Sequence, residues 1–256
     1  MLTALYVPGD RPDRFDKAAA SGADAVILDL EDAVAAERRA EARGHVVAWL
    51  AGGPDVDVQV RIGSLDDLVA LPDDVPIRLP KVESPADVDA VGDREVHALI
   101  ETALGVENAF AIASHPRVAS IGLGEADLAA DLGIIDESAL EWIRVRAVVA
   151  ARAAGLPAPM MAAYPDLADL DGLAASCAVG RALGMRGRTA VHPRQVPVIA
   201  AAFAPTEAEV VWAKQVLAAL DGADIGVATL PSGAMVDAAM ARRARELLRR
   251  TARPLT

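Results

Sequence analysis

The chain has 256 residues, of which 53 % are hydrophobic and 24 % charged, and its 37 acidic and 25 basic side chains give a formal net charge of −12. This composition is typical of a globular protein with one large domain or two small ones, and it excludes disordered and collagen-like chains. The acidic balance, with only 3 % aromatic residues, argues against a nucleic-acid-binding protein.

The first residues, Met1–Pro8, lack the basic start and the cleavage site of a signal peptide, which predicts a cytoplasmic protein. The longest stretch without a charged side chain, Ala153–Pro165, contains prolines and is shorter than the roughly 18 apolar residues that a membrane-spanning helix needs. We therefore expect no membrane span. The single cysteine, Cys177, lies among small residues and is predicted to be a core residue.

Up to Pro205, eight short runs rich in Val, Ile and Leu alternate with longer Ala-rich segments of helical period. This alternation predicts an α/β fold, a (β/α)₈ TIM barrel of parallel strands over residues 1–205. The predicted strands are Leu2–Val7, Ala25–Leu28, Val56–Arg61, Val75–Leu79, Val96–Ile100, Val118–Leu123, Ala158–Ala162 and Arg188–Val191. The predicted helices between them include Ala35–Leu50, Pro85–Val91, Ala139–Ala154 and Leu170–Leu183.

Residues 206–256 are predicted to form a C-terminal helical extension outside the barrel. Thr206 and Glu209 have the spacing of a capping box, and the helix that they begin is predicted to run to about Leu220. A Gly-rich stretch, Gly222–Gly233, precedes a last, arginine-rich helix from about Ala234 to Arg250. No strands are expected to pair in this part of the chain.

Nearly every predicted strand is followed by charged or polar residues, and these ends form the active-site rim of a βα barrel. Arg61 and Glu101 continue strongly apolar strands directly, so their charges must be paired or bind a ligand. Several carboxylates at the strand ends, with no histidines at ligand spacing, favour a hard cation such as Mg²⁺ over zinc. Arg11, Arg14 and Lys17 form a basic cluster suited to the phosphates of an anionic cofactor.

Eight motifs in fixed order carry a resemblance to a known family. They are Tyr6–Ala18, Asp29–Val34, Val60–Ile62, Leu79–Glu83, Ile100–Gly105, Gly124–Leu128, His192–Gln195 and Gly233–Asp237. Together they resemble the citrate lyase beta-subunit-like (CitE-like) proteins of the HpcH/HpaI aldolase superfamily, over nearly the whole chain. The resemblance implies a Mg²⁺-dependent carbon–carbon lyase acting on a 3-hydroxyacyl-CoA thioester of the malyl-CoA, citramalyl-CoA or citryl-CoA type, which gives acetyl-CoA and a 2-oxo acid reversibly.

The same resemblance implies roles for the residues near the metal. Glu101 and Asp127 would bind Mg²⁺ or Mn²⁺, and Glu101 would also contact the substrate. Arg61 would bind the substrate's carboxylate or thioester oxygen and stabilise an enolate. Glu31 and Asp32 would orient metal-bound water.

Further residues extend the expected site beyond the metal. Tyr6, Arg11 and Lys17 match positions that contact coenzyme A. Asp237 would act as the base in the site of a neighbouring subunit, so the resemblance implies a homo-oligomer, a homotrimer or homohexamer. Lys81 is expected to support the rim rather than to act as a nucleophile.

Two alternatives to a free-standing acyl-CoA lyase remain open from the sequence. One is a citrate lyase beta subunit that acts on an acyl-carrier-protein thioester within a complex, or a binding protein derived from it. The other is an aldolase for free 2-oxo acids, which would not need the basic cluster of the first loop. The residues also do not rank the hydroxyacyl thioesters or separate lyase from synthase or thioesterase outcomes.

Overall fold

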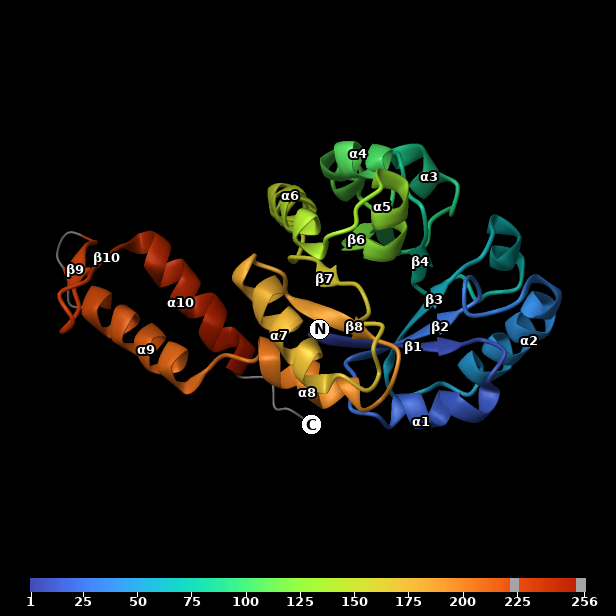
Figure 1. Ribbon diagram of the computed structural model, residues 1–256, viewed down its shortest axis with the longest axis horizontal. Helices are drawn as coiled ribbons and strands as arrows, with labels where there is room; N and C mark the ends of the chain where they lie inside the picture. Colours follow the sequence, from blue (N-terminus) through green and yellow to red (C-terminus); the bar gives the residue numbers. More distant parts are fainter. Residues whose placement is uncertain (222–225, 252–256) are drawn as a thin grey trace. The chain divides into compact units, whose positions relative to one another are not determined.

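The computed structural model describes residues 1–221 and 226–251 and divides the chain into two compact units, Met1–Phe203 and the residues from Ala204 onward (Figure 1). Residues 222–225 of the Gly-rich stretch lie outside the described residues. Each unit has its own hydrophobic core.

The first unit is a barrel of eight parallel strands in the order β6-β5-β4-β3-β2-β1-β8-β7. Strand β7 pairs only with β8 among the described residues, so the barrel is closed except for the hydrogen-bonded ladder between β7 and β6. This arrangement confirms the predicted TIM barrel. The strands are β1 (Thr3–Pro8), β2 (Ala25–Asp29), β3 (Asp57–Arg61), β4 (Ile77–Leu79), β5 (Val96–Ile100), β6 (Val118–Leu123), β7 (Met160–Met161) and β8 (Gly187–Ala190).

Helices lie between successive strands and cover the outside of the barrel, as α7 and α8 do beside β8 (Figure 1). The helices of this unit are α1 (Phe15–Ala19), α2 (Arg39–Leu50), α3 (Pro85–Asp89), α4 (Ala103–Ala113), α5 (Glu125–Leu132), α6 (Leu140–Ala153), α7 (Leu170–Ala182) and α8 (Gln195–Phe203). Short 3₁₀ helices span Pro12–Arg14, Ala36–Arg38, Leu65–Val69 and Glu137–Ala139.

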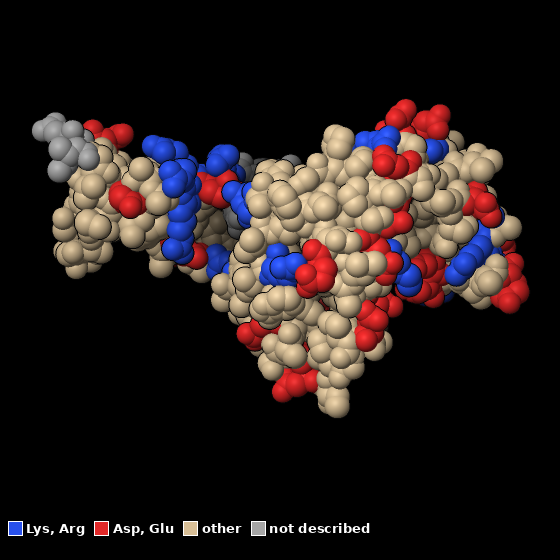
Figure 2. Space-filling view, turned by 90° about the horizontal axis from the view of Figure 1, so that it is seen from above, with Lys and Arg blue, Asp and Glu red and all other residues tan. Residues whose placement is uncertain are grey.

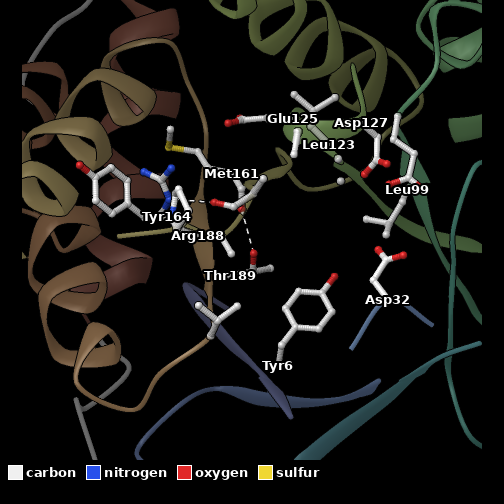
Figure 3. A pocket seen from close by; sticks show the side chains of 18 of the residues that line it. Tyr6, Asp32, Leu99, Leu123, Glu125, Asp127, Met161, Tyr164, Arg188 and Thr189 are labelled. Atoms are coloured by element: carbon white, nitrogen blue, oxygen red, sulfur yellow. Dashed lines mark hydrogen bonds between the residues drawn. The ribbon is translucent and has the colours of Figure 1, made fainter. Parts of the chain in front are cut away.

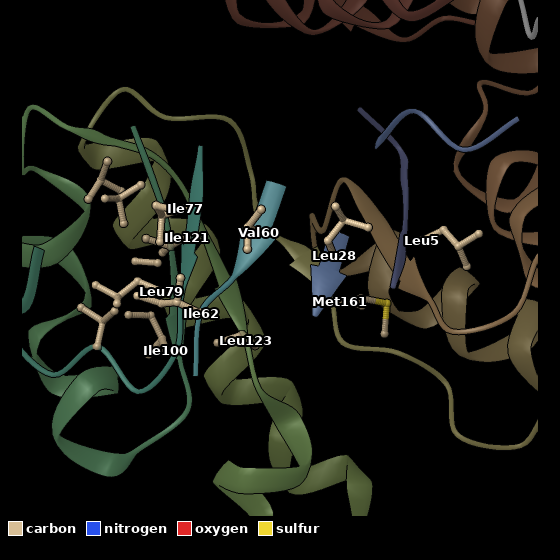
Figure 4. Packing of buried hydrophobic residues seen from close by; sticks show 14 of the residues in the cluster. Leu5, Leu28, Val60, Ile62, Ile77, Leu79, Ile100, Ile121, Leu123 and Met161 are labelled. Atoms are coloured by element: carbon tan, nitrogen blue, oxygen red, sulfur yellow. The ribbon is translucent and has the colours of Figure 1, made fainter. Parts of the chain in front are cut away.

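Alternation along the strands separates an apolar outer layer from a partly polar barrel interior. Side chains such as Leu28, Ile77 and Ile100 are fully buried and pack in the layer between strands and helices (Figure 4). The alternate positions face inward, and there Arg78 donates hydrogen bonds to Gln59. The interior therefore carries a polar layer directly below the ends of the strands.

Two predicted strands are shorter in the structure for a reason visible in the sequence. The strand predicted over Val75–Leu79 begins at Ile77, and the one predicted over Ala158–Ala162 is only Met160–Met161. Proline has no N–H to donate to a ladder, and Pro76 and Pro159 stand directly before the observed strands. The remaining predicted strands lie within two residues of the observed bounds.

The second unit contains α9 (Glu207–Asp221), the strands β9 (Ala228–Thr229) and β10 (Met235–Val236), and α10 (Ala238–Thr251). The predicted capping box is confirmed, because Thr206 N donates to Glu209 Oε2 at 2.8 Å and Glu209 N donates to Thr206 Oγ1 at 3.2 Å. The expectation of no paired strands here was wrong, since β9 and β10 form an antiparallel pair. The last helix consequently begins at Ala238 rather than near Ala234.

One described run, Gln195–Asp221, is long and apolar enough by composition to resemble a membrane-spanning helix. In the structure this run is two helices, α8 with 9 residues and α9 with 15, separated around Pro205. Each is shorter than the about 20 residues that a span requires. The apolar side chains of α8 serve the barrel instead, since Val196, Ile199 and Phe203 are buried in its core.

Charge is distributed unevenly over the surface (Figure 2). Acidic side chains are spread over the barrel unit, and a stripe of basic side chains crosses the unit that contains α9 and α10. Helix α10 supplies much of that charge, with arginines at positions 242, 243, 245 and 249. A polyanionic ligand of the barrel therefore needs a local basic group.

Candidate active site

A cavity of about 850 Å³ opens at the C-terminal ends of the barrel strands. Its wall includes Tyr6 from β1, Arg61 from the end of β3, Glu101 after β5 and Asp127 from the first turn of α5. Asp32 follows β2, and its carboxylate, the carboxylate of Asp127 and the Tyr6 hydroxyl point into the same space (Figure 3). The structure thus brings together five of the predicted site residues from five different strands or strand ends.

Arg61 is held by carboxylates on two sides. Its Nε and Nη2 donate to Asp29 Oδ1 and Oδ2 at 2.7 and 2.6 Å, and Nη1 lies 3.1 Å from Asp32 Oδ2 and 3.0 Å from Glu31 Oε2. Burial lowers the pKa of Arg61, but the hydrogen bonds and charge of Asp29 outweigh it and hold the pKa above its usual value. Of the five N–H groups of an arginine, these contacts leave one on Nη2 for a substrate oxygen.

The acidic turn after β2 is held by hydrogen bonds that keep its carboxylates next to Arg61. Asp29 accepts hydrogen bonds from the backbone N–H groups of Glu31 and Ala33 at 3.0 and 3.2 Å, which fixes the turn beneath Arg61. Glu31 is 7 % exposed and does not line the cavity, but its Oε1 accepts a hydrogen bond from Lys81 Nζ at 2.7 Å. Lys81 therefore anchors the rim by an ion pair, as expected.

Glu101 is a buried carboxyl, 3 % exposed, placed by the backbone of two neighbouring strand ends. Lys81 has a left-handed backbone with φ of 52°, which turns its N–H toward Glu101 Oε1 at 2.7 Å. On the other side, a Cβ on Gly124 would lie 2.1 Å from Glu101 Oε2, so only glycine permits this position of the carboxyl. Burial raises the pKa of Glu101 to about 7, the Lys81 N–H opposes this rise, and the charges of Glu31 and Asp127 add to it.

The two acidic residues of the motif after β6 have different surroundings. Glu125 forms a two-pronged ion pair with Arg144, with Nε–Oε1 and Nη2–Oε2 distances of 2.9 and 2.8 Å. Asp127 is exposed and makes no hydrogen bond or ion pair within the described residues. Of these two carboxylates, Asp127 is therefore the one available to a ligand in the cavity.

Glu101 and Asp127 fit a magnesium site. Both present oxygen ligands, Glu101 Oε2 accepts no hydrogen bond within the described residues, and the charge of Asp127 contributes to the raised pKa of Glu101. In the described part of the chain, no group of three or more His, Cys, Asp or Glu side chains has a metal-binding arrangement. The protein would thus supply two carboxylates, which suits Mg²⁺ because this ion keeps several waters and binds substrate oxygens.

The residues expected to contact coenzyme A are divided between the cavity and its outside. The Tyr6 ring lines the cavity and lies 5.1 Å from Arg61 Cζ, and burial raises the pKa of its hydroxyl against the opposing charges of Arg78 and Arg61. Arg11 is half-buried outside the lining and is paired with Asp13 at 2.9 Å. Lys17 is exposed on α1, also outside the lining.

The first loop also supplies a cation that the sequence placed in the basic cluster, but that the family resemblance did not match to a coenzyme A contact. Arg14 is exposed and lines the cavity. Its position at the mouth distinguishes it from Arg11 and Lys17, which lie on the same loop and helix but outside the cavity wall. Arg14 is thus the basic residue of this cluster that an anionic ligand in the cavity would meet.

Asp237 belongs to the second unit, where it begins α10. Its Oδ1 accepts hydrogen bonds from the backbone N–H groups of Ala239 and Met240 at 2.9 and 3.0 Å, so it caps the helix. The Asp237 carboxylate therefore has a structural role as a helix cap. Two different substitutions are needed to separate this role from a catalytic one.

Sequence reasoning missed three buried residues near the cavity, Asp29, Arg78 and Arg188. Asp29 was recognised as part of a strand-end motif, and its position two residues before Glu31 at the end of an apolar strand was the available signal. Arg78 lies within a predicted strand and Arg188 begins one, so both gave the signal that identified Arg61, a charge next to apolar strand residues. The sequence did not show which of these charged side chains forms an ion pair in the folded protein.

Comparisons with a family model, with curated proteins and with solved structures all find related proteins. Residues 2–193 match the family described as HpcH/HpaI aldolase/citrate lyase. A (3S)-malyl-CoA thioesterase of Cereibacter sphaeroides is 36 % identical over 241 residues, 87 % of this chain and 84 % of the relative. An L-malyl-CoA/beta-methylmalyl-CoA lyase of the same species is 33 % identical over 96 % of this chain and 92 % of the relative. The CitE protein of Mycobacterium tuberculosis, solved with magnesium, acetoacetate and coenzyme A, aligns with a TM-score of 0.86 and 33 % identity over 98 % of each chain.

Proposed function

This chain belongs to the HpcH/HpaI aldolase/citrate lyase family, and we propose that it is a Mg²⁺-dependent carbon–carbon lyase acting on a 3-hydroxyacyl-CoA thioester. The products would be acetyl-CoA and a 2-oxo acid, and the reaction would be reversible. One observation carries the proposal: Arg61 shares a cavity with two carboxylates, Glu101 and Asp127, that form no ion pair within the described residues.

Cleavage requires the bond between C2 and C3 of the acyl chain to break. The 3-hydroxyl loses its proton, the new carbonyl leaves as the 2-oxo acid, and the bonding electron pair moves onto the thioester as an enolate. The N–H of Arg61 Nη2 that Asp29 does not use would stabilise the enolate oxygen. Protonation at C2 then gives acetyl-CoA, and when bound, Mg²⁺ supplies the positive charge that polarises the carbonyl of the 2-oxo acid.

Asp237 is the proposed base that removes the C2 proton in the condensing direction. Its support is the family motif Gly233–Asp237, in which it stands at the start of α10. A base that completes the site of a neighbouring subunit requires an oligomer, and we therefore propose a homotrimer or homohexamer. A cytoplasmic location is part of the same proposal.

Coenzyme A recognition is proposed to involve Tyr6, Arg11 and Lys17, with Arg14 added from its position on the cavity wall. The phosphates of the coenzyme are repelled by a chain of net charge −12, so local cations must attract them. A substrate carried on an acyl-carrier protein or a free 2-oxo acid would depend less on these residues. Dependence on them therefore separates the acyl-CoA lyase from both alternatives.

Thioester hydrolysis is the second candidate outcome, because the malyl-CoA relative at 36 % identity is named a thioesterase. Hydrolysis would release free coenzyme A and leave the hydroxy acid intact, whereas cleavage of the C2–C3 bond keeps the thioester on acetyl-CoA. The site contains the pair of carboxylates and the arginine that enolate formation needs. This arrangement favours the lyase.

A substrate screen tests the proposal. The purified chain would be incubated with Mg²⁺ and malyl-CoA, citramalyl-CoA or citryl-CoA, and both acetyl-CoA and free coenzyme A would be quantified by chromatography. We expect acetyl-CoA from at least one substrate and its loss in EDTA. Activity only on an acyl-carrier-protein thioester or only on free 2-oxo acids would support the corresponding alternative.

A further inference from the structure

Arg78 is a cation on the cavity wall that the proposed chemistry does not use. It lies in the middle of β4, is 5 % exposed, and lines the same cavity as Arg61. Its Nε and Nη2 both donate to Gln59 Oε1, at 3.1 and 2.9 Å, and its Cζ lies 5.9 Å from the centre of the Tyr6 ring. All of these partners are neutral.

The charge of Arg78 is unpaired within the described residues. Arg61 and Arg144, the other two arginines near the strand ends with carboxylate contacts, form two-pronged ion pairs with Asp29 and Glu125. Arg78 has no carboxylate within ion-pair distance in the described part of the chain. Burying a charge without a counter-ion costs several kcal/mol, and a negatively charged ligand group at the free Nη1 of Arg78 would offset this cost.

The neighbour of Arg78 on the adjacent strand β5 is uncharged. His97 is its neighbour on β5 in the sheet register, and burial together with the charge of Arg78 lowers the pKa of His97 to about 3. The ring is therefore neutral at physiological pH, and its Nδ1 lies 2.7 Å from Ser120 Oγ. His97 therefore adds no second positive charge beside Arg78.

The cavity has room beside the guanidinium. Gly122 on β6 lines the cavity, and a Cβ there would lie 3.5 Å from Arg78 Nη1 and 3.2 Å from Leu99 Cδ2. Nη1 makes no hydrogen bond within the described residues. The glycine therefore leaves open space next to the one nitrogen of Arg78 that has no partner.

We propose that Arg78 Nη1 binds a second carboxylate on the 2-oxo-acid half of the substrate, which makes Arg78 a residue that determines specificity. The preferred substrate is then a 3-hydroxyacyl-CoA whose cleavage gives acetyl-CoA and a 2-oxodicarboxylate. This inference rests on the proposed lyase function for the identity of the substrate's other half. Arg61 serves the thioester oxygen, and Arg78 is its register partner on β4, with both guanidinium groups beside the Tyr6 ring.

Binding of 2-oxo acids tests the assignment without catalysis. Isothermal titration calorimetry in Mg²⁺ would compare oxaloacetate with 2-oxobutyrate, and 2-oxoglutarate with 2-oxovalerate; each pair shares a chain length and differs by a terminal carboxylate against a methyl group. We expect the wild type to bind one dicarboxylate at least about 10-fold more tightly than its partner, since a charge-assisted contact contributes about 1.4 kcal/mol or more. Arg78→Met should remove this preference and change the affinity for the monocarboxylate less than about threefold. Arg78→Lys should keep part of it.

Arg188→Met is the matched control. Arg188 is also buried and also lines the cavity, but its guanidinium is directed toward α7, where Nη1 donates to Ser176 Oγ at 2.8 Å, while Nε donates to Ala162 O at 2.8 Å. We expect this variant to retain the preference for the dicarboxylate. Equal binding of both members of each pair by the wild type, a preference that survives in Arg78→Met, or its loss in Arg188→Met would each overturn the assignment.

The wild-type comparison and Arg78→Lys decide the question even if Arg78→Met does not fold, which circular dichroism would reveal. Lyase activity on the hydroxyacyl-CoA panel is measured separately. Lyase turnover without a dicarboxylate preference contradicts this inference alone, and a dicarboxylate preference without turnover of any thioester contradicts the proposed function alone.

Discussion

Asp29 and Arg61 form a two-pronged ion pair at the edge of the cavity, with Nε–Oδ1 and Nη2–Oδ2 distances of 2.7 and 2.6 Å. They are paired in register on neighbouring strands β2 and β3, and Asp29 is only 2 % exposed. The Nε and Nη2 groups of Arg61 thus bind a carboxylate of the protein and not a substrate. Its orientation toward the substrate is set before any substrate binds.

Asp29→Asn should therefore destabilise the protein and reduce turnover together. Removing one partner of a buried ion pair costs up to about 3–5 kcal/mol, and the remaining contacts of Arg61 with Glu31 and Asp32 offset part of this loss. Asp32→Asn is the matched control: the Asp32 side chain is 62 % exposed, and losing its contact with Arg61 should cost at most about 1 kcal/mol. Chemical denaturation of both variants measures the difference. Similar losses in the two variants would show that Asp29 is no more important to Arg61 than a surface carboxylate.

The metal-free protein should lose stability as the pH rises through about 7. The pKa of Glu101 is about 7 against a usual value of 4.5, so the folded state holds this proton more tightly than the unfolded state. The resulting stabilisation is complete below pH 4.5 and is lost as the pH passes 7, a change of about 3 kcal/mol. Urea denaturation in EDTA at pH 4.5 to 8 measures the effect, with Glu101→Gln as the control that lacks the titrating group.

Magnesium provides the complementary readout for Glu101. The ion competes with the proton for this carboxyl, so the rise in melting temperature caused by Mg²⁺ should be larger at pH 8 than at pH 6. Parallel stability curves for wild type and Glu101→Gln, together with a Mg²⁺ effect that does not change with pH, would remove Glu101 from the metal site.

Much of the fold was predictable because the buried parallel strands are rich in Val, Ile and Leu and stand out as short apolar runs. The short hairpin of β9 and β10 was not, since two-residue strands such as Met235–Val236 have no period to recognise. Strands β4 and β7 were overextended because apolar neighbours of proline look like strand residues in composition but cannot donate to the ladder.

The candidate site was predictable to the extent that a charge at the end of an apolar strand is visible in the sequence. Arg61 and Glu101 were found in this way, and both line the cavity. Pairing was not visible: Glu125 and Asp127 belong to one motif, yet only the structure shows that Arg144 neutralises the first. Partners such as Arg144 lie on distant elements, so their contacts depend on the packing of the whole barrel.

Coenzyme A affinity should fall with rising salt and with loss of the first-loop cations. Arg14→Ala is expected to weaken binding more than Arg11→Ala, because Arg14 lines the cavity whereas Arg11 is already paired with Asp13. Lys17→Ala should also weaken binding. Calorimetry with coenzyme A at several salt concentrations measures these effects. Binding that is independent of salt and unchanged in all three variants would favour an acyl-carrier or free-acid substrate.

The two roles of Asp237 can be separated by two substitutions. Asn caps a helix about as well as Asp but cannot act as a base, whereas Ala does neither. We expect Asp237→Asn to lose nearly all turnover with an unchanged melting temperature, and Asp237→Ala to lose turnover and about 1 kcal/mol of stability. Full activity in Asp237→Asn would leave this residue as a helix cap only.

Mixed oligomers test whether Asp237 serves a neighbouring subunit. Chains carrying Asp237→Asn would be combined with chains carrying Glu101→Gln, neither of which is active alone. Some sites then join an intact metal pair with an intact base, so part of the activity should return. A fully active monomer, or no recovery in oligomers shown by mass spectrometry to be mixed, would contradict a shared site.

The cavity around Arg61, Glu101 and Asp127 is predicted to break a carbon–carbon bond and to leave the thioester intact. The most direct measurement is the product ratio from the start of the reaction, with acetyl-CoA, free coenzyme A and the 2-oxo acid quantified together by mass spectrometry. We predict acetyl-CoA and 2-oxo acid in equal amounts from the first turnovers, dependent on Mg²⁺ and absent in Asp127→Asn. Free coenzyme A with the intact hydroxy acid and no acetyl-CoA would contradict the claim.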